Sequence, residues 1–215
     1  MAWLPSLKYY KLHPDVPSPN FKTEGAACFD VCAFLTIKEK LTAYTGDNKK
    51  AEFACKRDTY LQWSEESYKP YVNVPYGSRV LIPTGLIFDI PEEYYLKVYT
   101  RSSSPLKNGL MLANSTGIID SDYVHELFLM LTNVHSNRSI RVNHLDRLCQ
   151  VEMRRKQTYN LIETDQKPEQ KTDRTGGFGS TDKVSDGIYQ PHLIDPKLFE
   201  QQTSVFKHKH KIAPR

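Results

Sequence analysis

The sequence predicts an all-β domain, and three observations favour this class. Its 215 residues include 13 prolines and 13 tyrosines. The β-branched and aromatic residues lie in short runs in which apolar and polar positions alternate, as in half-buried strands. Long stretches with the 3.6-residue period of a helix are few. We therefore expect an antiparallel β-sandwich or barrel, and the length suits one domain with appendages.

The expected strands follow one another at short intervals, separated by turn-forming residues. Three prolines, at positions 14, 17 and 19, end the first strand. The apolar run at 127–131 is expected to carry the chain into the core. The predicted strands lie at residues 9–12, 72–91 (a series with turns), 93–99, 118–119 and 127–131.

Composition narrows the function classes. The formal net charge of +4 is mild, and much of the excess lies in residues 207–215, so we expect no specific nucleic acid. No apolar run reaches the ~18 residues of a membrane span. Residues 1–8 do not form a secretion signal, so we expect a cytoplasmic protein without a membrane contact. The four cysteines show no metal-type pairing, which favours reduced thiols.

The stretch at residues 114–126 places acidic side chains on a predicted hairpin. Its first four residues carry turn chemistry. Asp120 and Asp122, at i and i+2, would share one face of a strand. One carboxylate could then orient or deprotonate a water while the other supports it. A solvated hairpin tip is the simpler explanation when the stretch is taken alone.

Two further stretches have chemistry that suits phosphate groups. Residues 100–109 place three hydroxyls beside an arginine, whose fork of donors matches a phosphate. In residues 173–181, three glycines free backbone N–H groups to converge on an anion, Arg174 adds charge, and Phe178 offers a flat face to a base. Taken singly, these stretches also suit a polar turn and a glycine-rich linker.

Five stretches, in chain order, resemble the five sequence motifs of the trimeric dUTPases. Gly-Ile-Ile-Asp-Ser-Asp-Tyr at 117–123 resembles the third motif, and Arg-Thr-Gly-Gly-Phe-Gly-Ser-Thr at 174–181 resembles the fifth. The first, second and fourth correspond to residues 23–33, 100–109 and 145–153. This sequence departs from the family pattern at Cys28, His125, Cys149 and the position of Arg174.

The resemblance implies an all-β, jelly-roll-like sandwich or barrel with a flexible C-terminal arm, assembled as a homotrimer. Motifs one, two and four of one chain, the hairpin of another and the glycine-rich arm of the third would build each site. It also implies hydrolysis of dUTP to dUMP and pyrophosphate with Mg²⁺. That activity would limit uracil incorporation into DNA and supply dUMP for dTTP synthesis.

The same resemblance gives the residues their roles. Asp120 would hold the water that attacks the α-phosphorus, and Asp30 would hold hydrated magnesium through water. Gln150 would reach the magnesium or the phosphates, and Tyr123 would lie against the deoxyribose. Arg147 is expected to be an ion-pair partner. The remaining contacts to phosphates and uracil are expected from Arg101, Ser102, Ser103, Asn114, Ser115, Gly117, Ile118, Ile119, Arg174, Phe178, Gly179, Ser180 and Thr181.

The family pattern also divides the chain. Residues 1–40 and 72–158 would form the β-domain core. Residues 41–71 exceed the family's usual connection, so we expect an inserted surface segment with a short helix capped by Asp58, available to a protein partner. Residues 159–182 would form the flexible arm and 183–215 a C-terminal extension.

Two alternatives stay open at this stage. A dCTP deaminase shares the fold and an Arg-Ser-Ser turn, and would use a glutamate near the hairpin, for which Glu126 is the candidate. A regulatory binding protein could keep the fold and use residues 41–71 to capture another protein. The segment 120–123 and the glycine-rich stretch speak against the deaminase, and a second, regulatory role remains compatible with an active enzyme.

Overall fold

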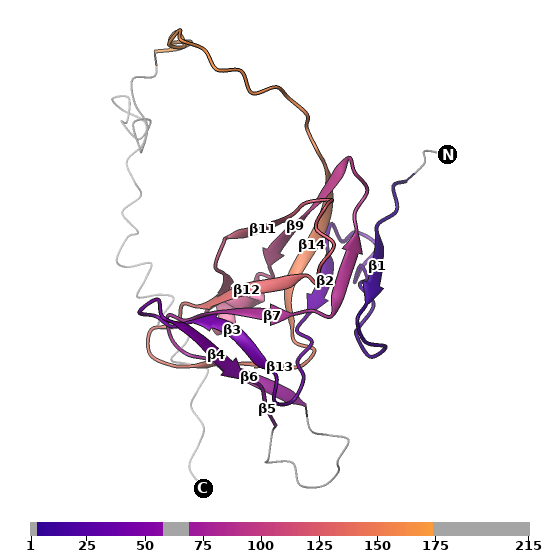
Figure 1. The fold of residues 1–215 in the computed structure, drawn as a ribbon, viewed down its shortest axis with the longest axis vertical. Coiled ribbons are helices and arrows are strands. Elements are labelled where there is room, and N and C mark those ends of the chain that lie inside the picture. The colour runs from indigo at the N-terminus through magenta and orange to yellow at the C-terminus, as the bar shows by residue number, and fades with distance from the viewer. Residues whose placement is uncertain (1–3, 58–68, 174–215) are drawn as a thin grey trace, which may run out of the picture. The chain divides into compact units, whose positions relative to one another are not determined.

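A computed structural model describes residues 4–57 and 69–173 (Figure 1). Apart from a short π-helix at Ser104–Asn108, the regular structure of these residues consists of β-strands. The predicted all-β class is confirmed. The compact unit Met1–Tyr159 contains every strand described here.

Within the described residues the strands form four antiparallel sheets. The largest has the order β10 (Leu110–Leu112), β12 (Phe128–Asn133), β7 (Arg79–Pro83), β3 (Lys40–Tyr44) and β4 (Lys50–Ala54). The second has the order β11 (Thr116–Ile119), β9 (Tyr94–Thr100), β14 (Arg147–Arg155) and β2 (Phe29–Cys32). The third has the order β13 (Ile140–Asn143), β6 (Pro70–Val74) and β5 (Lys56–Arg57), and β1 (Lys8–Lys11) pairs with β8 (Leu86–Asp89).

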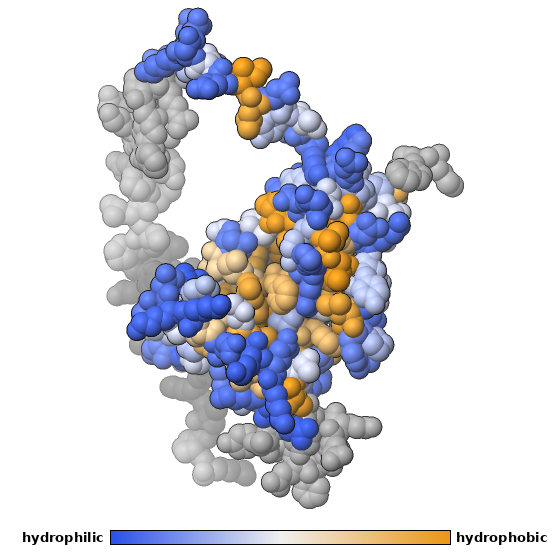
Figure 2. All heavy atoms as spheres, viewed as in Figure 1, coloured by the Kyte–Doolittle hydropathy of each residue, from blue (hydrophilic) through white to orange (hydrophobic). Residues whose placement is uncertain are grey.

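Apolar side chains from these sheets meet in one core. Successive residues of a strand point to opposite faces, so Leu96 and Val98 of β9 and Leu129 and Leu131 of β12 are all buried. Removing their apolar surface from water stabilises the fold. Hydrophobic side chains also reach the surface between charged ones (Figure 2), and those exposed on strands include Met111, Ile118, Phe128 and Met130.

The range predicted as an insertion begins inside a sheet. β3 lies between β7 and β4, and its Leu41 and Ala43 are part of the core. The division of the chain at residue 41 and a protein partner for residues 41–71 stay predictions. The helix predicted from Asp58 lies outside the described residues.

Residues 160–173 contain no strand or helix, and Leu161 and Ile162 are exposed. The glycine-rich stretch from Arg174 and the extension at 183–215 lie outside the described part of the chain. No helix among the described residues is long and apolar enough to cross a membrane.

Residues 114–126 do not form a hairpin of two strands paired with each other. β11 pairs with β9 in one sheet, while β12 pairs with β10 and β7 in another. Gly117 permits the close approach of β11 to β9, since a Cβ built on it would lie 3.1 Å from the Cβ of Val98. The stretch therefore connects two sheets, and together with strands of both it lines a cavity.

Candidate active site

A cavity of about 510 Å³ is lined by the stretch that carries the two acids. Asn114, Asp120 and Asp122 supply its polar groups, Tyr123 an aromatic ring and Gly117 a wall of backbone without a side chain. Strands of both large sheets complete the lining with apolar side chains, namely Leu81, Val98, Leu112, Ile118, Ile119, Phe128 and Met130. A cavity of this size with few polar groups suits a small organic ligand.

The two carboxylates lie in a turn rather than in a strand. β11 ends at Ile119, and the backbone N–H of Tyr123 donates to the carbonyl of Asp120 at 3.2 Å. The expectation of one shared strand face was therefore wrong, although both side chains line the cavity. Asp120 is exposed and has no ion-pair partner among the described residues, so its oxygens can accept protons from water.

Two contacts fix the ring of Tyr123. Its hydroxyl donates to the carbonyl of Glu126 at 2.8 Å. The ring also lies nearly at right angles to the ring of His125, with the ring centroids 5.6 Å apart, a favourable aromatic geometry. His125, where the family pattern has glycine, thus supports the ring that closes one wall of the cavity.

The start of the stretch is shaped by a tight turn. Ser115 has a left-handed backbone with φ of 61°, and the N–H of Thr116 donates to the carbonyl of Asn114 at 2.6 Å. This turn presents the side chain of Asn114 to the cavity. Ser115, predicted to contact the uracil, is exposed and is not among the residues that line the cavity.

A second cluster of predicted site residues surrounds Asp30 of β2. The Nε of Arg101 lies 3.1 Å from one oxygen of Asp30, and an Nη of Arg147 lies 3.0 Å from the other. Only 11% of the Asp30 side chain is exposed. The predicted role of Arg147 as an ion-pair partner is confirmed, and the contact of Arg101 with the same carboxylate was not foreseen.

A β-bulge in β14 positions the turn that follows β9. The register between β14 and β2 shifts between Arg147 and Cys149. The carbonyl of the intervening Leu148 accepts the backbone N–H of Arg101 at 3.1 Å and the hydroxyl of Ser104 at 3.3 Å. An extra residue in a strand leaves such a group unpaired within the ladder, and here it anchors a loop.

Ser102 and Ser103, which are predicted to hold phosphates, do not bond to the carbonyl of Leu148. Ser102 is exposed and Ser103 half-buried, whereas Ser104 is buried. Their side chains follow Arg101 in sequence at the end of β9. Hydroxyls at this end of the strand are therefore placed close to the Asp30 cluster.

One row of side chains crosses the four-stranded sheet. Thr116 pairs with Tyr99, Tyr99 with Gln150, and Gln150 with Asp30. Directly opposed residues have Cβ atoms about 5 Å apart, so Gln150 and Asp30 are cross-strand neighbours on one face of the sheet. The hydroxyl of Tyr99 donates to Glu152 at 2.7 Å, and this hydrogen bond is the main cause that raises the pKa of Tyr99 to about 12.

The two groups of residues lie at opposite ends of β9. Ile119 pairs with Leu96, so Asp120 follows β11 near the start of β9, while Arg101 directly follows its last residue. With a rise of about 3.3 Å per residue, the two positions are about 20 Å apart along the strand. One chain therefore does not bring Asp120 and Arg101 to the same phosphate group.

Glu126, the candidate proton shuttle of a deaminase, is engaged elsewhere. One of its oxygens accepts the N–H of Gly85 at 2.7 Å, and Glu126 does not line the Asp120 cavity. Burial is the main cause that raises the pKa of this carboxyl. Gly85 itself has φ of 69°, and a Cβ there would clash with the side chain of Val16. These contacts give Glu126 a role in holding the turn between β7 and β8.

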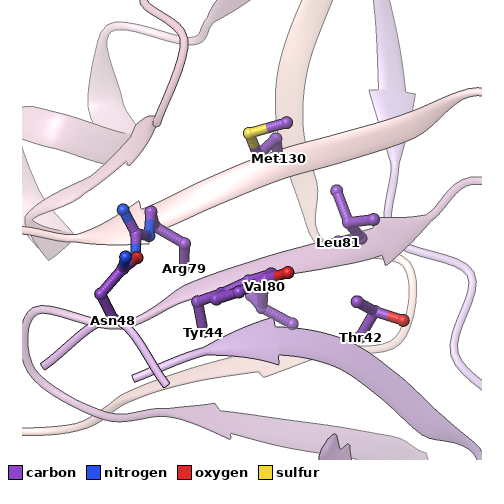
Figure 3. Close-up of a pocket in the computed structure, with 7 residues that line it drawn as sticks. All are labelled: Thr42, Tyr44, Asn48, Arg79, Val80, Leu81 and Met130. Carbon is purple, nitrogen blue, oxygen red and sulfur yellow. The ribbon is translucent and has the colours of Figure 1, made fainter. Parts of the chain in front are cut away.

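A smaller cavity of about 290 Å³ lies on the five-stranded sheet (Figure 3). The guanidinium of Arg79 donates to Asn48 at 2.5 Å and lies 5.7 Å from the centroid of the Tyr44 ring. These contacts attach the β3–β4 turn to β7. Its described lining contains no carboxylate and none of the predicted site residues, so we do not take it as the active site.

Five predicted substrate contacts fall outside the described residues: Arg174, Phe178, Gly179, Ser180 and Thr181. Sequence reasoning did not find the support of Tyr123 by the Glu126 carbonyl or the carbonyl of Leu148 as an anchor. Both are backbone groups, which residue types do not reveal.

The chain is similar to known proteins over most of its length. The sequence model of the dUTPase family matches residues 67–182. A deoxyuridine 5'-triphosphate nucleotidohydrolase of Leptospira interrogans is 39% identical over 172 residues, which cover 80% of this chain and 94% of that protein. One of Wolinella succinogenes is 29% identical over 178 residues, covering 82% and 94%.

A solved structure supports the fold. The dUTPase of Staphylococcus bacteriophage 80alpha, in a form bound to dUpNHpp, has a TM-score of 0.59 with 16% identity and covers 82% of this chain and 98% of that one. At that identity the likeness concerns the fold alone. The match of the family sequence model and the similarity to the Leptospira protein establish the larger point: this chain belongs to the dUTPase family.

Proposed function

We propose that this chain hydrolyses dUTP to dUMP and pyrophosphate in sites that three copies share. Family membership supports the substrate class. The observation that carries the chemistry is the open cavity in which the unpaired carboxylate of Asp120 lies beside Asn114, Tyr123 and the backbone of Gly117. This arrangement combines a general base with a surface that can bind the nucleobase and the sugar of a ligand.

In this proposal the Asp120 end binds the nucleoside and activates water. Asn114 and the backbone around Ile118 recognise the uracil edge, and Tyr123 lies against the deoxyribose and excludes a 2′-hydroxyl. The apolar side chains that line the cavity exclude water from the uracil ring. Asp120 accepts a proton from the attacking water, because its oxygens are free of other partners.

The Arg101 end of another copy holds the phosphates. Ser102 and Ser103 offer hydroxyl donors, Arg101 supplies a fixed positive charge, and Gln150 contributes a neutral amide. Arg174, Ser180 and Thr181 of the glycine-rich stretch complete the contacts in this proposal. These hydrogen-bond donors together stabilise the negative charge that develops on the phosphates during attack.

The residues around Asp30 fit a magnesium ion that keeps its waters. Asp30 and Gln150 are directly opposed in the sheet, and the oxygens of a carboxylate and of an amide are both hard donors. Each carboxylate oxygen retains a second lone pair beyond its bond to an arginine. The described residues offer no group of three or more acidic, histidine or cysteine side chains as a cage. When bound, magnesium would neutralise the triphosphate.

The separation along β9 supports the proposed sharing of the site. About 20 Å lies between the Asp120 and Arg101 positions of one chain, so a complete site needs a second copy. Exposed hydrophobic side chains near the cavity, among them Phe128 and Met130, suit contacts between copies. We therefore propose a homotrimer in which no isolated chain is active.

The activity is tested by incubating the purified full chain and Mg²⁺ with dUTP, dCTP or UTP. We expect pyrophosphate from dUTP, little from UTP, and no ammonia from dCTP. Ammonia release would instead identify a deaminase. Absence of any product, with the protein folded and trimeric, would overturn the proposal.

A further inference from the structure

The carboxylate of Asp30 is already occupied by protein cations. Arg101 contacts one of its oxygens at 3.1 Å and Arg147 the other at 3.0 Å. A divalent cation held by Asp30 must therefore share these oxygens with two guanidinium groups or displace one of them. The side chain of Asp30 is nearly buried, so this competition takes place with little screening by water.

The two arginines are not equivalent. Arg101 also donates to the carbonyl of Arg147 at 3.1 Å, and its own N–H is bonded to Leu148. Its side chain is 27% exposed, against 45% for Arg147. Among the residues that the structure describes, Asp30 is the acceptor of the Arg147 guanidinium. Arg147 is therefore the cation that can leave at lower cost.

The surroundings carry more positive than negative charge. Lys22 lines the same small pocket as Asp30 and Arg147, and Asp30 is the carboxylate in that lining. Counting Arg101, three cations thus lie near Asp30, while the neighbouring carboxylate of Glu152 is engaged by Tyr99 and Arg154. This balance opposes the binding of a further cation until a polyanion such as a triphosphate is present.

We propose that Arg147 is a positioning residue that occupies Asp30 in the nucleotide-free protein and transfers its guanidinium to the phosphates when metal and nucleotide bind together. Arg147 would thereby keep the Asp30 site weak for a metal ion alone and make metal binding depend on the nucleotide. The identity of the nucleotide rests on the proposed function. The behaviour toward a metal ion alone does not.

The test measures binding of Mn²⁺, which can be followed by its electron paramagnetic resonance signal, to the full-length protein without nucleotide. We expect Arg147→Gln to bind Mn²⁺ about tenfold more tightly than the wild type, because one competing cation is removed. Arg147→Lys keeps a cation and should stay near the wild type. Arg154→Gln, on the same strand and paired with Glu152 at 3.5 Å, is the matched control and should also bind as the wild type does.

Addition of dUpNHpp should reverse the order. The wild type then gains more Mn²⁺ affinity than Arg147→Gln, because the variant has lost a phosphate contact. A merely structural role would weaken Mn²⁺ binding in the variant under both conditions, which would overturn the proposal. An equal Mn²⁺ affinity of Arg147→Gln and the wild type would also overturn it. Arg147→Met is measured in the same way if the glutamine variant does not fold, and Mn²⁺ bound by the nucleotide-free wild type as tightly as with dUpNHpp would also overturn it.

The outcomes separate this inference from the proposed function. If the wild type does not hydrolyse dUTP but Arg147→Gln still binds Mn²⁺ more tightly, the competition at Asp30 stands and the substrate is wrong. If dUTP is hydrolysed but the variant shows no gain, the proposed function stands and Arg147 has another role.

Discussion

The two carboxylates at the ends of β9 have opposite environments. Asp120 is exposed, lies in a turn and has no ion-pair partner among the described residues, whereas Asp30 is nearly buried and contacts two arginines. A group that takes a proton from water needs a free lone pair. A group that organises phosphates and a metal ion benefits from a fixed position. The fold supplies the first in a turn and the second on a strand, β2, at the edge of the four-stranded sheet.

The largest effect should come from the free carboxylate. Asp120→Asn is expected to lower the turnover of dUTP by on the order of 10² or more, because the amide cannot accept the proton. Binding of dUpNHpp and the Tm should change little, since the substitution conserves shape at an exposed position. Asp122→Asn is the matched control, with a smaller loss. Near-normal turnover of Asp120→Asn would show that another group is the base.

Mixing two inactive proteins tests whether the ends of different chains meet. Asp120→Asn and Arg101→Gln chains, unfolded and refolded together in equal amounts, should recover activity in about a quarter of the sites if each site takes Asp120 and Arg101 from different copies of a trimer. Each variant refolded alone is the control. No recovery, with mixed trimers demonstrated by a mass tag, would place both residues of a site in one chain.

The paired carboxylate should matter for stability where the free one does not. Asp30→Asn leaves Arg101 and Arg147 without their anion, and we expect a loss of about 1–2 kcal/mol in the free energy of unfolding, reduced from the buried case because both arginines are partly exposed. Urea unfolding at a fixed protein concentration measures it. Equal stability of Asp30→Asn and Asp120→Asn would contradict the contrast drawn above.

The smallest expected effect is on the pH dependence of stability. His144 is half-buried, its Nδ1 accepts the N–H of Leu35 at 3.1 Å, and burial is the main cause that lowers its pKa. The unfolded state then binds the proton more readily, so this contribution to stability is full above the unfolded pKa of about 6.5 and is lost as the pH falls below it.

His144→Asn removes the titration and keeps an acceptor. We expect the Tm of the wild type to fall more than that of the variant between about pH 7 and about pH 5.5, by on the order of 1 °C. Parallel curves for the two proteins would mean that other groups set the acid dependence.

Local patterns were enough to predict most of the strands. The alternation in residues 93–99 and 127–131 corresponds to β9 and β12 within a residue or two. The stretch at residues 114–126 gave more than half of the cavity lining, because Asn114, Gly117 and Asp120 are close in sequence. The pairing of β11 with β9 was missed, since turn residues predict a reversal but not the partner strand.

Contacts between distant residues could not be predicted from the sequence. Asp30 and Arg147 are separated by 117 positions, and their encounter depends on the register of β2 with β14. The sequence showed an acid and two arginines but not that they neutralise one another. The bond from Gly85 to Glu126 is similar, because a carboxylate that could serve a reaction instead holds a turn.

The bulge at Leu148 makes the position of Arg101 robust to mutation. Its carbonyl, which belongs to the backbone, holds both the N–H of Arg101 and the hydroxyl of Ser104. The side chain of Leu148 is buried and serves only packing. Replacement by isoleucine or methionine can therefore change stability while leaving the phosphate-binding turn in place, whereas deletion of a single residue here would restore a regular ladder and remove both bonds. At this site the protein should tolerate substitutions more readily than insertions or deletions.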